Sequence, residues 1–152
     1  MSIPDDVAAL IADAPLSAHL ATSVDDRPHV APVWYVYEGG DAYRAASDAE
    51  TVRDDRLWVL TGGKKLENVR RNPRVAVSIE RADESGVDWA VQLLGTARES
   101  DDDARIAAVE AAMTEIYRDG TASDGGEDAD PPGEWALLGI RVGTATVQRY
   151  DE

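Results

Sequence analysis

Short apolar segments that alternate like β-strands, separated by turn residues, limit the fold of this chain more than any other feature. Residues 74–80 show the pattern best, because Val75, Val77 and Ile79 fall on one face of an extended chain. The other strand-like segments are residues 16–23, 29–37, 57–60, 87–98 and 134–149. Helical spacing is found in residues 4–14, 64–72 and 100–120. About six strands in consecutive hairpins, with helices to one side, predict a mainly β, mostly antiparallel barrel of the α+β kind.

Some positions within this pattern predict local irregularities. Pro32 lies inside the expected strand 29–37. Because proline cannot donate to a ladder, it predicts an edge strand, a bulge or a backbone that faces a ligand. Gly95 predicts a bulge in a later strand. The acidic residues 43–56 are interpreted as a long loop or a ragged hairpin extension, and residues 121–133 as an acidic loop.

The composition excludes several kinds of function. A chain of 152 residues predicts one domain over residues 1–152, large enough to bury a core. The absence of cysteine excludes disulfides and thiolate chemistry, and the two histidines show no metal-ligand spacing, so no metal site is predicted. A net charge of −15 opposes binding to nucleic acid or to an anionic membrane. No apolar run is long enough to span a bilayer and no basic signal-peptide region is present, so we expect a cytoplasmic protein.

The acidic charge has two possible explanations, disorder and adaptation to high salt. Apolar residues make up 43% of the chain and follow clear periodicities, which argues against disorder. Concentrated salt screens dense surface charge over a few ångströms and makes it tolerable. Abundant aspartate, arginine in place of lysine and the absence of phenylalanine agree with this second explanation. The sequence therefore predicts a halophilic protein of haloarchaeal type.

The segment Thr61–Lys65 stands out because Lys64 and Lys65 are the only lysines in the chain. They follow an apolar run and a glycine pair, and they begin a short expected helix. Two cations at a helix N-terminus are unfavourable beside the positive end of the helix dipole, unless an anion lies between them. A strand, a glycine turn and basic residues at a helix start form a geometry that binds phosphate. The alternative interpretation is a solvated helix start without a ligand. The segment is not a Walker loop, because the glycine spacing of that motif is absent.

The order of these signals resembles the pyridoxamine 5′-phosphate oxidase-like family of FMN-binding split barrels. The resemblance covers about residues 15–150. It rests on Ala21–Ser23, Arg27–Trp34, Leu57–Thr61, Lys64–Val77, Gly139–Val142 and Arg149–Tyr150. It implies a six-stranded antiparallel split β-barrel with flanking helices.

The resemblance also implies a cofactor site. Lys64 and Lys65 match the basic pair that holds the FMN phosphate, and Thr61 matches the hydroxyl residue that ends the preceding strand. The backbone of Val30, Ala31, Pro32 and Val33 matches the strand along the isoalloxazine ring. Members of the family are usually homodimers with flavin between the subunits, and Gln92 is a weaker candidate for a contact from the partner.

For function, the resemblance implies a flavin-dependent oxidoreductase that acts on a small molecule. The alternatives are a non-catalytic flavin-binding or flavin-sensing dimer, and a reductase of the same fold that uses the deazaflavin F420. The chain ends without the Arg-x-His substrate motif of the true oxidase. No residue is identified as a catalytic acid or base, which agrees with flavin chemistry because the cofactor itself carries the reaction.

Overall fold

The computed structural model describes residues 3–12, 14–39, 43–44, 51–52, 55–117 and 135–150. The helices are α1 (Asp5–Ile11), α2 (Gly63–Arg71) and α3 (Asp103–Ile116). The strands are β1 (Ala18–Val24), β2 (Arg27–Val33), β3 (Val36–Glu38), β4 (Tyr43–Arg44), β5 (Thr51–Val52), β6 (Arg56–Gly62), β7 (Arg74–Asp83), β8 (Gly86–Ser100) and β9 (Trp135–Arg149). Among the described residues no helix is long and apolar enough to cross a membrane. The acidic loop expected at residues 121–133 lies outside them.

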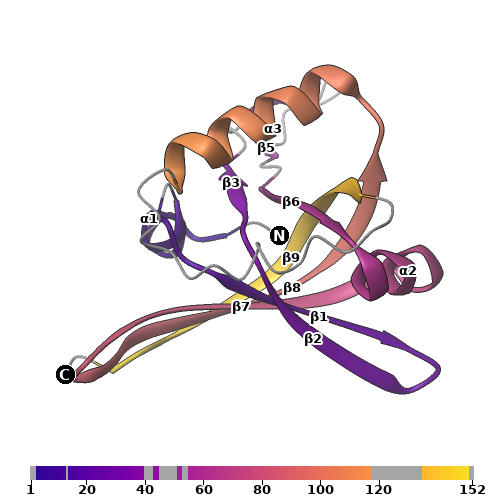
Figure 1. Ribbon diagram of the computed structural model, residues 1–152. Helices are drawn as coiled ribbons and strands as arrows, with labels where there is room; N and C mark the ends of the chain where they lie inside the picture. The colour runs from indigo at the N-terminus through magenta and orange to yellow at the C-terminus, as the bar shows by residue number, and fades with distance from the viewer. Residues whose placement is uncertain are drawn as a thin grey trace.

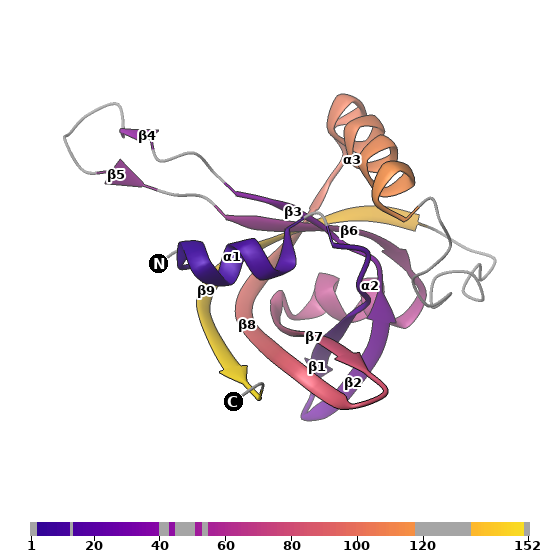
Figure 2. The same cartoon turned by 90° about the vertical axis from the view of Figure 1, so that its left-hand side faces the viewer.

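The main sheet has seven antiparallel strands in the order β2-β1-β7-β8-β9-β6-β3. It curls into an open barrel, with α1 at one end, α2 at the other and α3 across β3 and β6 (Figures 1 and 2). The predicted antiparallel split-barrel fold is confirmed. The predicted number of six strands is wrong, because the expected strand 29–37 is two strands, β2 and β3, at opposite edges of the sheet. The barrel is therefore not closed.

The opening of the barrel lies between β2 and the second half of β6. β3 pairs with β6 only at Arg56–Trp58. In the described part of the chain, β2 is hydrogen-bonded on one side only, to β1, although β2 and β6 approach each other. We call the space between β2 and Val59–Gly62 the split. It leaves two stretches of strand edge without ladder partners among the described residues.

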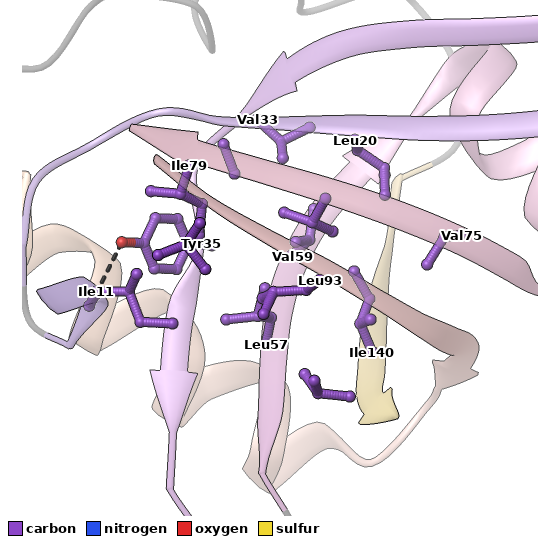
Figure 3. Close-up of a cluster of buried hydrophobic side chains, with 14 of the residues drawn as sticks. Ile11, Leu20, Val33, Tyr35, Leu57, Val59, Val75, Ile79, Leu93 and Ile140 are labelled. Carbon is purple, nitrogen blue, oxygen red and sulfur yellow. Dashed lines mark hydrogen bonds between the residues drawn. The ribbon is translucent and has the colours of Figure 1, made fainter. Parts of the chain in front are cut away.

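Tyr117, just after α3, supports the break between β2 and β3. Its hydroxyl donates to the carbonyl of Leu16 at 2.7 Å and accepts from the backbone N–H of Tyr35 at 3.2 Å. Its ring stacks on Trp34, with centroids 4.4 Å apart and planes 3° from parallel. The hydroxyl of Tyr35 in turn donates to the carbonyl of Ile11 at 2.7 Å (Figure 3). Aromatic side chains thus provide partners where the chain leaves one sheet edge for the other.

The core fills the inside of the barrel, where the inward positions of β6, β7 and β8 meet (Figure 3). Leu66 and Val69 of α2 and Val7 of α1 are part of this cluster. A second cluster joins α3 to the other face of β6. It includes the helix face predicted from the sequence, Ile106, Val109, Met113, Ile116 and Tyr117.

Trp58 holds α3 in place over β6. Its indole N–H donates to Glu38 at 2.8 Å, and the Arg105 guanidinium lies 4.9 Å from the ring centroid and bonds to the same carboxylate at 3.1 Å. A Cβ atom added to Gly139 would lie 2.7 Å from Cζ3 of Trp58, so the ring needs a glycine beneath it. These contacts fix the helix that borders the groove described below.

Two predicted irregularities are confirmed. Pro32 lies on β2, which is an edge strand, the position in a sheet to which proline is usually confined. The β8–β9 register shifts between Leu94 and Gly95, and a Cβ atom on Gly95 would collide with the carbonyl oxygen of Arg141. β4 pairs with β5, which agrees with the hairpin extension predicted for part of residues 43–56; residues 45–50 and 53–54 lie outside the described residues.

Tyr117→Phe tests the support at the break. The substitution keeps the ring but removes the hydroxyl that serves Leu16 and Tyr35. A buried polar group left without its partner costs about 1–3 kcal/mol, so we expect the free energy of unfolding in urea to fall by about that amount. Tyr150→Phe is the control, because Tyr150 is 53% exposed and its hydroxyl bonds only to Gln148. Equal stability of Tyr117→Phe and the wild type would contradict the assigned role.

The same contact predicts a dependence on pH. Burial raises the pKa of Tyr117 to about 12, above the value of about 10 for an unfolded chain. The contribution of the neutral hydroxyl is fully present below pH 10, and it is lost as the pH rises from about 10 to about 12. Over this interval the wild type should lose more stability than Tyr117→Phe, as measured by urea unfolding at each pH.

Candidate functional site

The predicted lysine pair lies where β6 passes directly into α2. Gly63, the first residue of the helix, has a φ of 67°, a left-handed conformation that favours glycine. No atom lies within 4 Å of a Cβ built on it, so the space beside this turn is open. Lys64 is exposed and Lys65 is half-buried. The glycine pair predicted from the sequence therefore forms a sharp turn that presents the lysines at the helix start.

The start of α2 is electropositive and has no counter-charge of its own. Its first turn contains no acidic residue, and Gly62 provides no side-chain cap for the free N–H groups. Within the described ranges, neither Lys64 nor Lys65 forms an ion pair, although the chain has 30 acidic residues. Burial lowers the pKa of the Lys65 ammonium, which is the response of a cation that has lost water without gaining a partner. An anion bound here would meet both ammonium groups and the helix N–H groups.

Polar contacts hold α2 in a fixed position on the barrel. Nδ2 of Asn68 donates to Oγ1 of Thr22 at 3.0 Å, and Nδ2 of Asn72 donates to the carbonyl of Ser23 at 2.9 Å. Arg70 binds Glu99 through two bonds of 2.9 and 2.8 Å. Asn68 and Asn72, to which no role was assigned from the sequence, therefore dock α2 onto β1.

Thr61 lies within the same turn region but is covered. It is 2% exposed and pairs with Ala136. Alternation along β6 places its side chain on the inward face with Leu57 and Val59. Its predicted contact with a phosphate stays a prediction.

β2 provides the other side of the split. Val30 and Pro32 face outward, whereas Ala31 and Val33 lie opposite inward residues of β1. His29 is opposite Thr22, the partner of Asn68, and its Nδ1 is buried without a hydrogen-bond partner in the described structure. From the sequence, His29 is placed on a strand near the proposed ring site and interpreted as a core or rim histidine; the nitrogen without a partner beneath α2 is revealed only by the structure.

Gln92 lies on the outer face of β8. Its row across the sheet is Pro32, His19, Ser78 and Gln92. Three strand spacings separate Gln92 from Pro32, which is about 14 Å. A single small group therefore cannot contact both Gln92 and β2 of the same chain.

Two neighbouring rows of this outer face carry no Asp, Glu, Lys or Arg, and the exposed Arg74 and Glu80 of β7 lie on either side of them. The neighbouring row is Val30, Ala21, Ala76 and Leu94. We call the two rows together the outer-sheet patch. Val30 is 63% exposed and Leu94 58% exposed, although charged residues form 30% of the chain. These two side chains are the exposed large hydrophobic residues of the patch.

A groove lies on the other side of β6, beneath α3. It has a volume of about 560 Å³ and is lined by Trp34, Leu60, Glu110, Met113, Thr114 and Tyr117. Trp34 directly follows β2, and Leu60 directly precedes Thr61. The groove therefore adjoins the split at Trp34, just after β2, and at Leu60 of β6.

Fold and site together define a split-barrel protein with an electropositive helix start beside the split. The family model described as pyridoxamine 5′-phosphate oxidase matches residues 4–149. The chain therefore belongs to the pyridoxamine 5′-phosphate oxidase family. No functionally curated protein matches the chain in sequence.

Solved structures agree on the fold. A FAD-binding protein from Mesorhizobium loti is 20% identical with a TM-score of 0.63, covering 97% of this chain and 95% of its own. An F420 reductase is 20% identical with a TM-score of 0.62, covering 95% and 98%. A FAD-binding protein from Mycobacterium smegmatis is 17% identical with a TM-score of 0.57, covering 97% of both chains. At these identities the likeness concerns the fold alone.

Proposed function

We propose that this protein binds FMN and acts as a flavin-dependent oxidoreductase on a small molecule. The observation that carries the proposal is the start of α2, with its uncapped N–H groups and the unpaired ammonium groups of Lys64 and Lys65. Membership of the family and the FAD-binding proteins among the similar structures support a flavin over other phosphorylated ligands.

The residues present fit such a cofactor. Lys64, Lys65 and the first N–H groups of α2 would hold the phosphate, through charge-assisted hydrogen bonds worth about 1.5–3 kcal/mol each. The free edge of β2 over Val30–Val33 would hold the ring, and His29 Nδ1 is a buried polar atom that still needs a partner there. The bound flavin supplies the redox chemistry. The chain binds and orients the cofactor and excludes water from it.

We propose further that the protein is a homodimer joined through the outer-sheet patch. A second copy is the occupant that suits it best, because the patch carries no charge on a protein of net charge −15. Two copies that met through charged surfaces would repel each other. The distance of about 14 Å between Gln92 and β2 of one chain also suits a cofactor contact from the partner.

Two alternatives to this proposal can be distinguished from it by experiment. The F420 reductase among the similar structures favours F420 as the alternative cofactor, and a non-catalytic flavin carrier or sensor is the other alternative. Mass spectrometry of the ligand that co-purifies in molar salt distinguishes FMN from F420. Anaerobic reduction by NADPH or by reduced F420, followed by reoxidation with candidate acceptors, distinguishes an oxidoreductase from a carrier.

Substitution of the lysines tests the cofactor site. Loss of one charge-assisted contact of about 1.5–3 kcal/mol should weaken FMN binding at least tenfold in Lys64→Ala or Lys65→Ala. Quenching of FMN fluorescence on titration measures the affinity. Arg81→Ala, which removes an exposed cation on β7, should bind FMN like the wild type. Unchanged affinity in both lysine variants would refute the phosphate site.

A charge within the outer-sheet patch tests the dimer. Leu94→Asp or Val30→Asp places carboxylates against each other across the proposed interface, so we expect monomers at concentrations at which the wild type is dimeric. Sedimentation velocity in 2 M KCl reports the mass. Tyr150→Asp, at an exposed aromatic outside the patch, is the control. A monomeric wild type, or a dimeric Leu94→Asp variant, would exclude this interface.

We also infer adaptation to high salt, of the haloarchaeal type, from the charge of −15 and the near absence of lysine. Salt shortens the range of repulsion among the acidic side chains. The thermal unfolding midpoint should therefore rise steadily between 0.2 and 2 M KCl. A midpoint that is constant or falls over this range would contradict the inference.

A further inference from the structure

The groove beneath α3 is not used by the proposed cofactor site. Its volume of about 560 Å³ lies within the range of small-molecule sites. It lies on the α3 side of β6, whereas the inward face of that strand carries Leu57 and Val59. The groove is a separate space that meets the split at Trp34 and Leu60.

The wall of the groove suits a flat ring. Trp34 stacks with one face on Tyr117, and the side chains of Leu60 and Met113 continue the apolar surface. The hydroxyl of Tyr117 is already bonded to Leu16 and Tyr35, so it offers little to a ligand. Aromatic and thioether groups of this kind bind planar apolar surfaces through stacking and dispersion.

Charge narrows the class of ligand. Among the described residues, Glu110 is the only charged one that lines the groove; it is exposed, and none of them forms an ion pair with it. A carboxylate beside an indole attracts a ring that carries positive charge, since the face of tryptophan also attracts cations. The negative net charge of the protein acts in the same direction.

We propose that the groove binds a small planar aromatic cation of the N-alkylpyridinium class. The start of α2 selects an anion, so the two neighbouring sites have opposite charge preferences. A role as the substrate subsite of the flavin, next to β2, rests on the proposed function. Binding in the groove does not depend on it.

Three probes with the same ring test the charge preference. They are 1-methylnicotinamide, nicotinamide and nicotinate, which are cationic, neutral and anionic. Isothermal titration calorimetry of the full chain, at the lowest KCl concentration that keeps it folded, should give tightest binding for the cation. We expect about fivefold between cation and neutral ring, smaller in 2 M KCl because of screening. No saturable binding of the cation, or equal affinity for all three probes, would overturn the proposal.

Variants of exposed residues locate the binding. Glu110→Gln should remove the preference for the cation, and Glu110→Lys should reverse the order of the probes. Thr114→Trp should fill the groove and weaken all three at least tenfold. Asp103→Asn removes an exposed carboxylate from the same helix outside the groove, and should leave the affinities unchanged. An effect of Asp103→Asn equal to that of Glu110→Gln would show a general charge effect and reject the site.

A double variant, Lys64→Ala with Lys65→Ala, separates this proposal from the cofactor assignment. It should bind 1-methylnicotinamide with wild-type affinity while FMN binding is lost. If FMN does not bind the wild type but the groove still binds the cation more tightly than the other two probes, the proposed function fails and this inference stands. If FMN binds the wild type but the groove binds the cation no more tightly than the other two probes, this inference fails and the proposed function stands.

Discussion

The hydroxyl of Tyr117 is the contact on which the open barrel depends. The segment 27–38 serves both edges of the sheet, so its backbone must leave one ladder before it enters the other. Peptide groups at such a break need partners, because an unpaired buried N–H or carbonyl is costly. The Tyr117 hydroxyl provides a hydrogen-bond partner for Tyr35 and also bonds to Leu16, so it joins three segments that are distant in the sequence. A side chain at the end of α3 thereby replaces a ladder bond.

The position of the candidate site follows from the same arrangement. Because β2 ends at the break, its outer edge stays open opposite the end of β6, where α2 begins. The asparagine contacts then fix α2 against β1, so the two lysines cannot move away from the split. In the described part of the chain, the lysine pair is held beside strand edges that lack ladder partners and an imidazole nitrogen that lacks a hydrogen-bond partner.

Much of this was accessible from sequence because it is local. Alternation identified the strands, proline marked the edge strand, and glycine marked the bulge at Gly95 and the turn before Lys64. The division of residues 29–37 was not predictable, because both halves have the composition of a strand and only the curvature of the sheet separates them. The roles of Tyr117 and of Asn68 were missed for a similar reason, since their partners are 82 and 46 residues away. Composition alone singled out the lysines, whereas the unpaired nitrogen of His29 depends on three-dimensional burial.

The covalent continuity of β2 and β3 limits how far the two edges of the sheet can separate at one end of the split. Val33 and Val36 are three residue steps apart, so they can separate by no more than about 10 Å however the barrel breathes. At this end peptide geometry therefore sets an upper limit to the distance between β2 and β3 that does not depend on side-chain packing. Towards Arg27 no covalent limit of this kind applies.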